Sequence, residues 1–148
     1  MQIDIRRLGP GDEDAVLAAG ALFDDAPDPE ATRRFLAEPG HHLLLACDAR
    51  GAPVGFVSGV EAVHPDKGAE MLLYELSVDE PARRQGVGRA LTEALAALAR
   101  ERGCRGMWVG TEGDNVAAER TYERAGGRAA GAFVSFEWSF GMDNPGRG

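Results

Sequence analysis

The first forty residues predict one strand and two helices. Isoleucines at alternate positions predict a strand over residues 1–8, and a Gly-Pro-Gly break ends it. Asp12 is placed to cap a helix that runs to about residue 22. Asp28 followed by Pro29 is a favourable N-cap and first-turn pair for a second helix, which should end before the Pro-Gly pair at 39–40.

The next forty residues predict three strands. Apolar runs at 42–47, 54–63 and 70–78 are separated by short turn segments that contain Asp, Gly and Pro. Because connections this short cannot cross over a sheet, neighbouring strands should be antiparallel.

The periodicity changes after Val78. Apolar side chains recur at helical spacing between 87 and 102, and Gly103 is placed to end that helix. A short apolar strand at 107–111 follows. The strands at 70–78 and 107–111 are therefore joined by a helical crossover and should lie parallel.

The last part of the chain predicts a helix and a closing strand. Asp114 or Asn115 can cap a helix that ends at the paired glycines after residue 125. Apolar side chains alternate with polar ones over 133–140, which predicts a strand whose edge could pair with a second copy in a homodimer. Trp108 and Trp138 are expected in the core. Residues 141–148 are expected to fray.

Together these elements predict the fold class. They describe one α/β domain over residues 1–140, with a mixed, mostly antiparallel sheet flanked by helices and one parallel strand-helix-strand crossover. The length of 148 residues fits one domain, and 44% hydrophobic residues suffice for a core.

Charge and composition narrow the class of partner. A net charge of −8 argues against a nucleic-acid binder and suits a cationic small-molecule amine, although such charge also keeps proteins soluble. No apolar run approaches the roughly 20 residues of a membrane helix and no signal core opens the chain, so we expect a cytoplasmic protein without a membrane partner. The three histidines and two cysteines lack metal-ligand spacing, so we expect no metal.

The most informative motif opens the helix at 87–102. Free backbone N–H groups and a positive dipole mark a helix start, two glycines let an anion approach the backbone, and three arginines there need an anionic ligand to offset their repulsion. The motif lacks the features of nucleotide-hydrolase and dinucleotide loops. A helix start with flexible glycines and surface arginines is the alternative. The predicted pyrophosphate-binding residues are Arg83, Arg84, Gln85, Gly86, Val87, Gly88, Arg89 and Ala90.

This motif resembles the Arg/Gln-x-x-Gly-x-Gly/Ala signature of the GNAT acetyltransferase superfamily. The preceding Leu-Ser-Val is similar to the family's strand end, and Asn115 through Gly126 resembles the second half of its pattern. The resemblance implies acetyl-coenzyme A as cosubstrate, with its pantetheine arm between the strands at 70–78 and 107–111. It also implies cofactor contacts from Leu76, Val78 and Asn115.

Two residues are candidates for catalysis. Glu75 lies in an apolar strand, where a carboxylate is costly unless it is paired or faces an open cleft. Facing the acceptor, it could take a proton from an ammonium group, whereas a structural ion pair with an arginine is the alternative. The resemblance gives Tyr122 the role of general acid toward the departing thiolate. A tyrosine that merely packs on the sheet is the alternative.

The strand around Glu75 also bears on the acceptor. It resembles aminoglycoside 3-N-acetyltransferases, with Glu75 in place of Asp and Ser77 in place of Ala, and this implies acetylation of the 3-amino group of an aminoglycoside. The carboxylates expected to bind substrate are Asp24, Asp25, Asp28, Glu75 and Glu137. Helix capping and a solvated turn are the alternative for the first three. An N-acetyltransferase for a polyamine, an amino acid or a protein N-terminus, and a non-catalytic acetyl-coenzyme A sensor, stay open.

Overall fold

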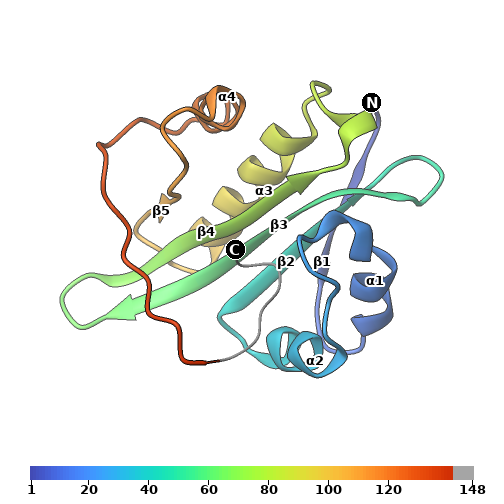
Figure 1. Cartoon of the computed structure of the whole chain (residues 1–148), viewed down its shortest axis with the longest axis horizontal. Coiled ribbons are helices and arrows are strands. Elements are labelled where there is room, and N and C mark those ends of the chain that lie inside the picture. The colour runs from blue at the N-terminus through green and yellow to red at the C-terminus, as the bar shows by residue number, and fades with distance from the viewer. Residues whose placement is uncertain (142–148) are drawn as a thin grey trace.

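A five-stranded sheet forms the centre of the molecule, and helices cover both of its faces (Figure 1). The structure is a computed structural model that describes residues 1–141. The strands are β1 (Asp4–Leu8), β2 (His41–Cys47), β3 (Pro53–His64), β4 (Gly68–Val78) and β5 (Met107–Trp108). The helices are α1 (Glu13–Ala18), α2 (Pro29–Ala37), α3 (Val87–Glu101) and α4 (Val116–Arg124), with 3-10 turns η1 (Gly20–Leu22) and η2 (Glu80–Ala82).

The strand order in the sheet follows the chain, β1-β2-β3-β4-β5. The first four strands pair antiparallel through short turns, and β5 pairs parallel with β4 after the crossover through α3. The prediction of a mixed, mostly antiparallel α/β sheet with one parallel crossover is confirmed.

Each face of the sheet has its own core. The apolar stripe of α3, with Leu91 and Leu95 fully buried, packs on the side chains of β3 and β4 that include Val57 and Met71. The opposite face buries Phe56 beneath α1, η1 and α2. Alternate residues of one strand thus serve two cores, as the period of two requires.

Helix ends follow the predicted signals with one exception. The Asp28 carboxylate accepts a hydrogen bond from Ala31 N at 2.8 Å and starts α2, and Gly103 ends α3 with a φ of 81°. Asp12 does not cap its helix through its side chain; its carboxylate accepts from Gly9 N across the preceding turn. The predicted helix over 12–22 is correspondingly shorter, with a 3-10 turn at its end.

The predicted closing strand over 133–140 is wrong. Residues 127–140 have no regular structure, and Phe133, Val134, Phe136, Trp138 and Phe140 are 72–86% exposed. A strand over 133–140 needs a neighbouring strand of similar length to hydrogen-bond with, and β5 pairs over only two residues. Alternation of apolar and polar side chains cannot form a strand without such a partner. The expectation that both tryptophans are core residues also fails, since Trp108 is 48% and Trp138 76% exposed. The tail prediction for 142–148 lies outside the described residues.

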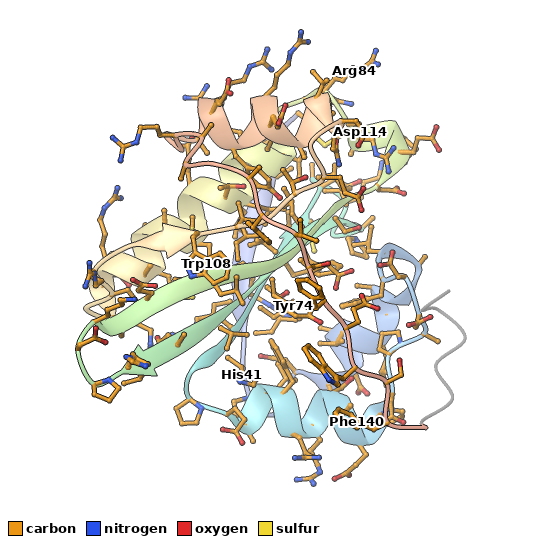
Figure 2. All side chains as sticks on the ribbon, turned by 60° about the vertical axis from the view of Figure 1, so that its left-hand side comes forward. His41, Tyr74, Arg84, Trp108, Asp114 and Phe140 are labelled. Atoms are coloured by element: carbon orange, nitrogen blue, oxygen red, sulfur yellow. The ribbon has the colours of Figure 1, made fainter. Side chains whose placement is uncertain are left out.

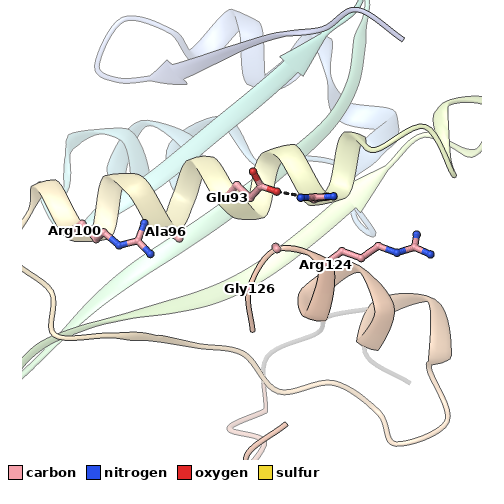
Figure 3. Close-up of a pocket in the computed structure, with 7 residues that line it drawn as sticks. Glu93, Ala96, Arg100, Arg124 and Gly126 are labelled. Atoms are coloured by element: carbon pink, nitrogen blue, oxygen red, sulfur yellow. Dashed lines mark hydrogen bonds and ion pairs between the residues drawn. The ribbon is translucent and has the colours of Figure 1, made fainter. Parts of the chain in front are cut away.

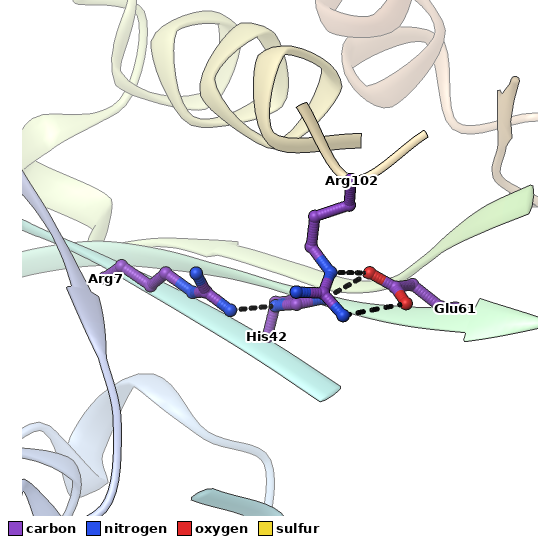
Figure 4. Close-up of polar contacts among 4 residues, drawn as sticks. All are labelled: Arg7, His42, Glu61 and Arg102. Carbon is purple, nitrogen blue, oxygen red and sulfur yellow. Dashed lines mark hydrogen bonds and ion pairs between the residues drawn. The ribbon is translucent and has the colours of Figure 1, made fainter. Parts of the chain in front are cut away.

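A polar cluster ties four elements together at the far end of α3 (Figure 4). His42, whose side chain is fully buried, accepts from Arg7 at Nδ1 and donates to Glu61 from Nε2 at 2.9 Å. Arg102, just after α3, binds the same Glu61 carboxylate. Since the arginine can only donate, His42 is neutral with its proton on Nε2. Burial lowers the pKa of His42, and the Arg102 hydrogen bond lowers the pKa of Glu61.

None of the helices in residues 1–141 combines the length and the apolar character needed to cross a membrane.

Candidate active site

The loop between β4 and α3 presents a row of backbone donors. Ala90 N is the first amide of α3 with a hydrogen bond, to Gly86 O at 3.0 Å, and the amides of residues 84–89 have no partner within the described chain. Arg84 and Gly86 both have positive φ, 63° and 84°. Alternating handedness turns successive N–H groups toward one concavity, a geometry that binds anions. Residues 84–89 therefore fit a pyrophosphate, whereas the predicted amide of Ala90 is already used.

Arginine side chains around this loop differ in what they contact. Arg83 donates to Val78 O at 3.2 Å, which closes the loop onto the end of β4, and Arg89 pairs with Glu93 one turn along α3. Arg84 lies at the outer end of the loop (Figure 2). Gln85 donates to Pro81 O at 3.0 Å. Arg83 and Gln85 hold the shape of the loop, and Arg84 is placed to add charge at its mouth.

Gly88 lies where α3, α4 and the end of β4 converge. A Cβ at this position would be 3.2 Å from Thr121 Cγ2, 3.6 Å from Val78 Cγ2 and 3.7 Å from Leu76 Cδ2. Asn115 caps α4 by accepting from Ala118 N at 3.1 Å, so its position in the site is fixed by a structural role. The absence of a side chain at Gly88 therefore leaves space between the start of α3, α4 and the end of β4.

Beyond Leu72, β4 and β5 no longer pair. Their register contains two pairs, Met71 with Met107 and Leu72 with Trp108, although the strand β4 continues to Val78. Within the described chain, no backbone hydrogen bond joins 73–78 to 109–113. This leaves the outward backbone groups of Leu76 and the N–H of Val78 without a strand partner beside the cradle, while Val78 O is taken by Arg83. The unpaired amides of 84–89 and this strand edge thus fit a pyrophosphate joined to an extended chain that bears amide groups.

Glu75 occupies a bulge in β4. Ser58 pairs with Glu75 and Gly59 with Leu73, which leaves Tyr74 as an extra residue without a partner. Glu75 shares the sheet face of its partner Ser58, which is the side covered by α1 and α2. Its side chain is half-buried, and burial raises its pKa, helped by the charges of Asp24 and Asp25. The Arg ion pair considered above is absent for Glu75 among residues 1–141.

Two contacts fix the acidic segment next to Glu75. Ser77 Oγ donates to Leu22 O at 2.6 Å, and the ring of Phe23 stacks on buried Phe56 with 4.2 Å between centroids. The chain that leaves η1 is thereby held against β4, and Asp24 and Asp25 come next. Three carboxylates are brought together with no arginine or lysine as neutralising partner among the residues described. Such a group attracts an acceptor that carries positive charge.

The other two predicted substrate carboxylates are not part of this group. Asp28 caps α2, which is the alternative that its sequence context offered. Glu137 lies in the exposed segment 133–140 and makes no hydrogen bond or ion pair with the described residues.

Tyr122 lies on the opposite side of the open β4 edge. It is half-buried and packs against the same core cluster as Leu76 and Val78. Burial raises its pKa, so the phenol keeps its proton at neutral pH. A half-buried O–H group near the free edge of β4 can donate to an anion that forms there.

A separate groove of about 400 Å³ runs along the outer face of α3 (Figure 3). Arg89, Glu93 and Arg100 line one wall, and the end of α4 from Arg124 to Gly126 lines the other. Neither Glu75 nor Tyr122 reaches it. Within the described part of the chain, no cluster of three or more His, Cys, Asp or Glu side chains could hold a metal ion.

Sequence reasoning missed two residues of the site. Ser77 anchors the acidic segment through its hydrogen bond to Leu22 O. In the sequence, the only signal for this role was a serine where the resembling acetyltransferases have alanine. Tyr74 is 62% exposed beside Glu75, although it stands in the same apolar run. The bulge at Tyr74 depends on how β4 pairs with β3, and the pattern of residues along one strand does not predict that pairing.

Comparison with known proteins places the chain among acetyltransferases. The model described as "Acetyltransferase (GNAT) family" matches residues 13–127. L-2,4-diaminobutyric acid acetyltransferase of Streptomyces coelicolor is 36% identical over 86 residues, 55% of this chain and 49% of that protein. Mycothiol acetyltransferase of Salinispora tropica is 33% identical over 148 residues, 91% of this chain and 48% of that protein. The chain spans about half the length of these curated relatives.

Solved structures share the fold over nearly the whole chain. An aminoglycoside acetyltransferase from an uncultured soil metagenomic sample, in complex with sisomicin, has a TM-score of 0.85 at 20% identity and covers 93% of this chain and 96% of its own. A second such enzyme, HMB0005, has a TM-score of 0.77 at 25% identity, with 94% and 100% covered. AAC(6')-Iy in complex with a bisubstrate analogue of coenzyme A has a TM-score of 0.79 at 18% identity, with 95% and 100% covered.

Proposed function

The chain belongs to the GNAT acetyltransferase family, and on that premise we propose that it transfers the acetyl group of acetyl-coenzyme A to an amino group of a cationic small molecule. The observation that carries the proposal is the half-buried Glu75 on β4, within the stretch 73–78 that does not pair with β5, with Asp24 and Asp25 following the segment that Ser77 holds against β4. Acetyl-coenzyme A, when bound, supplies the acetyl group as an activated thioester.

Three parts of the chain bind and orient the reactants. The amides of residues 84–89 hold the pyrophosphate, and the free edge of Leu76 and Val78 holds the pantetheine arm. Glu75, Asp24 and Asp25 bind the acceptor as an ammonium ion. Binding both reactants beside the unpaired edge of β4 supplies the orientation that a bimolecular transfer needs.

Glu75 and Tyr122 move the protons. An ammonium group is not a nucleophile, so the acceptor must lose a proton, which a Glu75 carboxylate with a raised pKa is suited to accept. Tyr122 keeps its proton at neutral pH and donates it on the side where the thiol leaves. The general base typically contributes about 10²–10⁴-fold to rate.

For the acceptor we propose an aminoglycoside. Three carboxylates without a cationic partner favour a molecule with several ammonium groups. The 3-amino group is the position proposed from the strand around Glu75, and the 6'-amino group is the other outcome that product mapping distinguishes.

An amino acid with a second amine is the other candidate, since a diaminobutyric acid acetyltransferase is 36% identical over 86 residues. Its carboxylate would be repelled by Glu75, Asp24 and Asp25, so we place it second. A homodimer also stays a proposal, to be measured by sedimentation; the five exposed apolar side chains of 133–140 support it.

A thiol-release assay tests the function. Acetyl-coenzyme A is offered with sisomicin, 2,4-diaminobutyrate, spermidine or an alanyl peptide, and the product is mapped by mass spectrometry. We expect turnover on sisomicin that falls at least about 100-fold in Glu75→Gln. Glu70→Gln is the matched control, because Glu70 lies on the same strand but pairs with Arg105 at 3.7 Å. Cofactor binding without turnover on any amine would favour a sensor.

A further inference from the structure

Tyr74 is exposed on β4 directly before the proposed general base, Glu75. As the bulged residue it has no partner in β3, and 62% of it is exposed directly before Glu75 in the chain. Among the described residues, its hydroxyl makes no hydrogen bond. The ring of Tyr74 is therefore free to contact a molecule that binds beside Glu75.

Other aromatic side chains accompany Tyr74. Trp108 is 48% exposed on β5 and pairs in register with Leu72, two residues before Tyr74. Figure 2 shows Tyr74 and Trp108 along the same stretch of β4 and β5, where the segment after α4 crosses toward α2. Phe133 of that segment lies against Gly110, 2.8 Å from where a Cβ would stand. Three exposed rings thus come from three segments that meet beside the site.

Glu75, Asp24 and Asp25 fix the charge that an acceptor must carry, but a linear polyamine satisfies them as well as a ring does. The exposed rings discriminate further. The flat apolar face of an aromatic ring packs against the C–H face of a cyclic acceptor, whereas a flexible linear chain offers no such face. A sugar or aminocyclitol ring that bears amines therefore gains a contact that spermine lacks.

We propose that Tyr74 is a specificity-determining residue whose ring stacks on the sugar or aminocyclitol ring that carries the reactive amine, with Trp108 extending the same surface. The inference rests on the proposed function for the reaction and the aminoglycoside acceptor, and it adds the residue that distinguishes an amine on a ring from an amine on a linear chain. Tyr74 positions the acceptor and takes no part in proton transfer.

Binding and turnover are measured separately for Tyr74→Ala, Tyr74→Phe and the wild type. Calorimetry gives the dissociation constants of sisomicin, spermine and coenzyme A, and the assay gives kcat and KM for sisomicin. Loss of one stacking contact corresponds to about 5- to 30-fold, or about 1–2 kcal/mol. Val63→Ala is the control, because Val63 is 77% exposed at the other end of β3.

We expect Tyr74→Ala to weaken sisomicin binding and raise its KM by about 5- to 30-fold, with kcat within about 3-fold and the constants for spermine and coenzyme A unchanged. Tyr74→Phe and Val63→Ala should behave as the wild type. Unchanged sisomicin binding in Tyr74→Ala, or an equal loss for spermine and coenzyme A, would overturn the inference. If the wild type acetylates no amine yet binds sisomicin through Tyr74, the proposed reaction fails and the binding site stands.

Discussion

Gly88→Ala should weaken coenzyme A binding at the cradle while leaving the stability of the fold nearly unchanged. The added Cβ would be 3.2 Å from Thr121 Cγ2 and at ordinary contact distances from Val78 and Leu76. Alanine is favoured over glycine in a helix by about 0.5–1 kcal/mol, and the close approach to Thr121 offsets part of that gain. The free energy of unfolding should therefore stay within about 1 kcal/mol of the wild type, a Tm change of about 4 °C or less.

The effect on coenzyme A should be much larger than the effect on stability. If the methyl group keeps the pyrophosphate from one backbone N–H, the loss of a hydrogen bond to a charged group costs about 1.5–3 kcal/mol. The KM for acetyl-coenzyme A should then rise about 10- to 100-fold. Thermal unfolding and initial rates at varied acetyl-coenzyme A measure the two effects on one sample.

A double variant distinguishes a methyl group that blocks the pyrophosphate from one that displaces α4. Thr121→Ser removes the Cγ2 atom that the new methyl group would approach, so Gly88→Ala/Thr121→Ser restores the packing of α4 but keeps the methyl in the cradle. We expect the KM to stay high in the double variant. Recovery of the wild-type KM would mean that α4 had moved, and an unchanged KM in Gly88→Ala alone would place the pyrophosphate elsewhere.

Three further predictions concern proton transfer and stability. Tyr122→Phe should lower kcat about 10- to 100-fold with the KM for acetyl-coenzyme A nearly unchanged; an unaltered kcat would remove Tyr122 from the acid role. Because the pKa of Glu75 is raised, its charged form costs stability as pH rises above 4.5, so Glu75→Gln should gain stability relative to the wild type more at pH 7 than at pH 4 and should lose the acidic limb of the kcat/KM profile. Persistence of that limb would indicate another base. His42→Ala removes a hydrogen bond from the Glu61 carboxylate and should cost about 1.5–3 kcal/mol by chemical unfolding. Because the pKa of His42 is lowered, the wild type should lose stability as pH falls below about 6.5, and a slope equal to that of His42→Ala would contradict the neutral buried histidine.

Periodicity predicted most of the fold because it reports burial along a single element. The stripe of Leu91 and Leu95 must be covered on one face of its helix, and the apolar runs of the central strands on both faces of the sheet, so their type and order follow from the sequence. Residues 133–140 show where this reasoning ends. They alternate as regularly as any strand, but β5 offers only two residues to pair with, and a partner is not encoded in alternation.

The candidate site, like the fold, has parts that the sequence predicts and parts that it does not. The conformation of the loop follows from local sequence, because Gly86 acts through its own positive φ and Gly88 through its missing Cβ. The prediction of Glu75 with Asp24 and Asp25 is supported by the contact from Ser77 to Leu22, which spans 55 residues. Glu137 was assigned from its place on a strand that does not form. Tyr74 could not be assigned, since the bulge that exposes it depends on pairing with β3.

The central claim is tested most directly by the product of one incubation. The protein is mixed with acetyl-coenzyme A and sisomicin, and free thiol and the mass of the sugar are followed together, beside Glu75→Gln and Glu70→Gln. The account predicts one acetyl group added per thiol released, lost in Glu75→Gln and kept in Glu70→Gln. Thiol released without an acetylated amine, or equal turnover in Glu75→Gln, would contradict it.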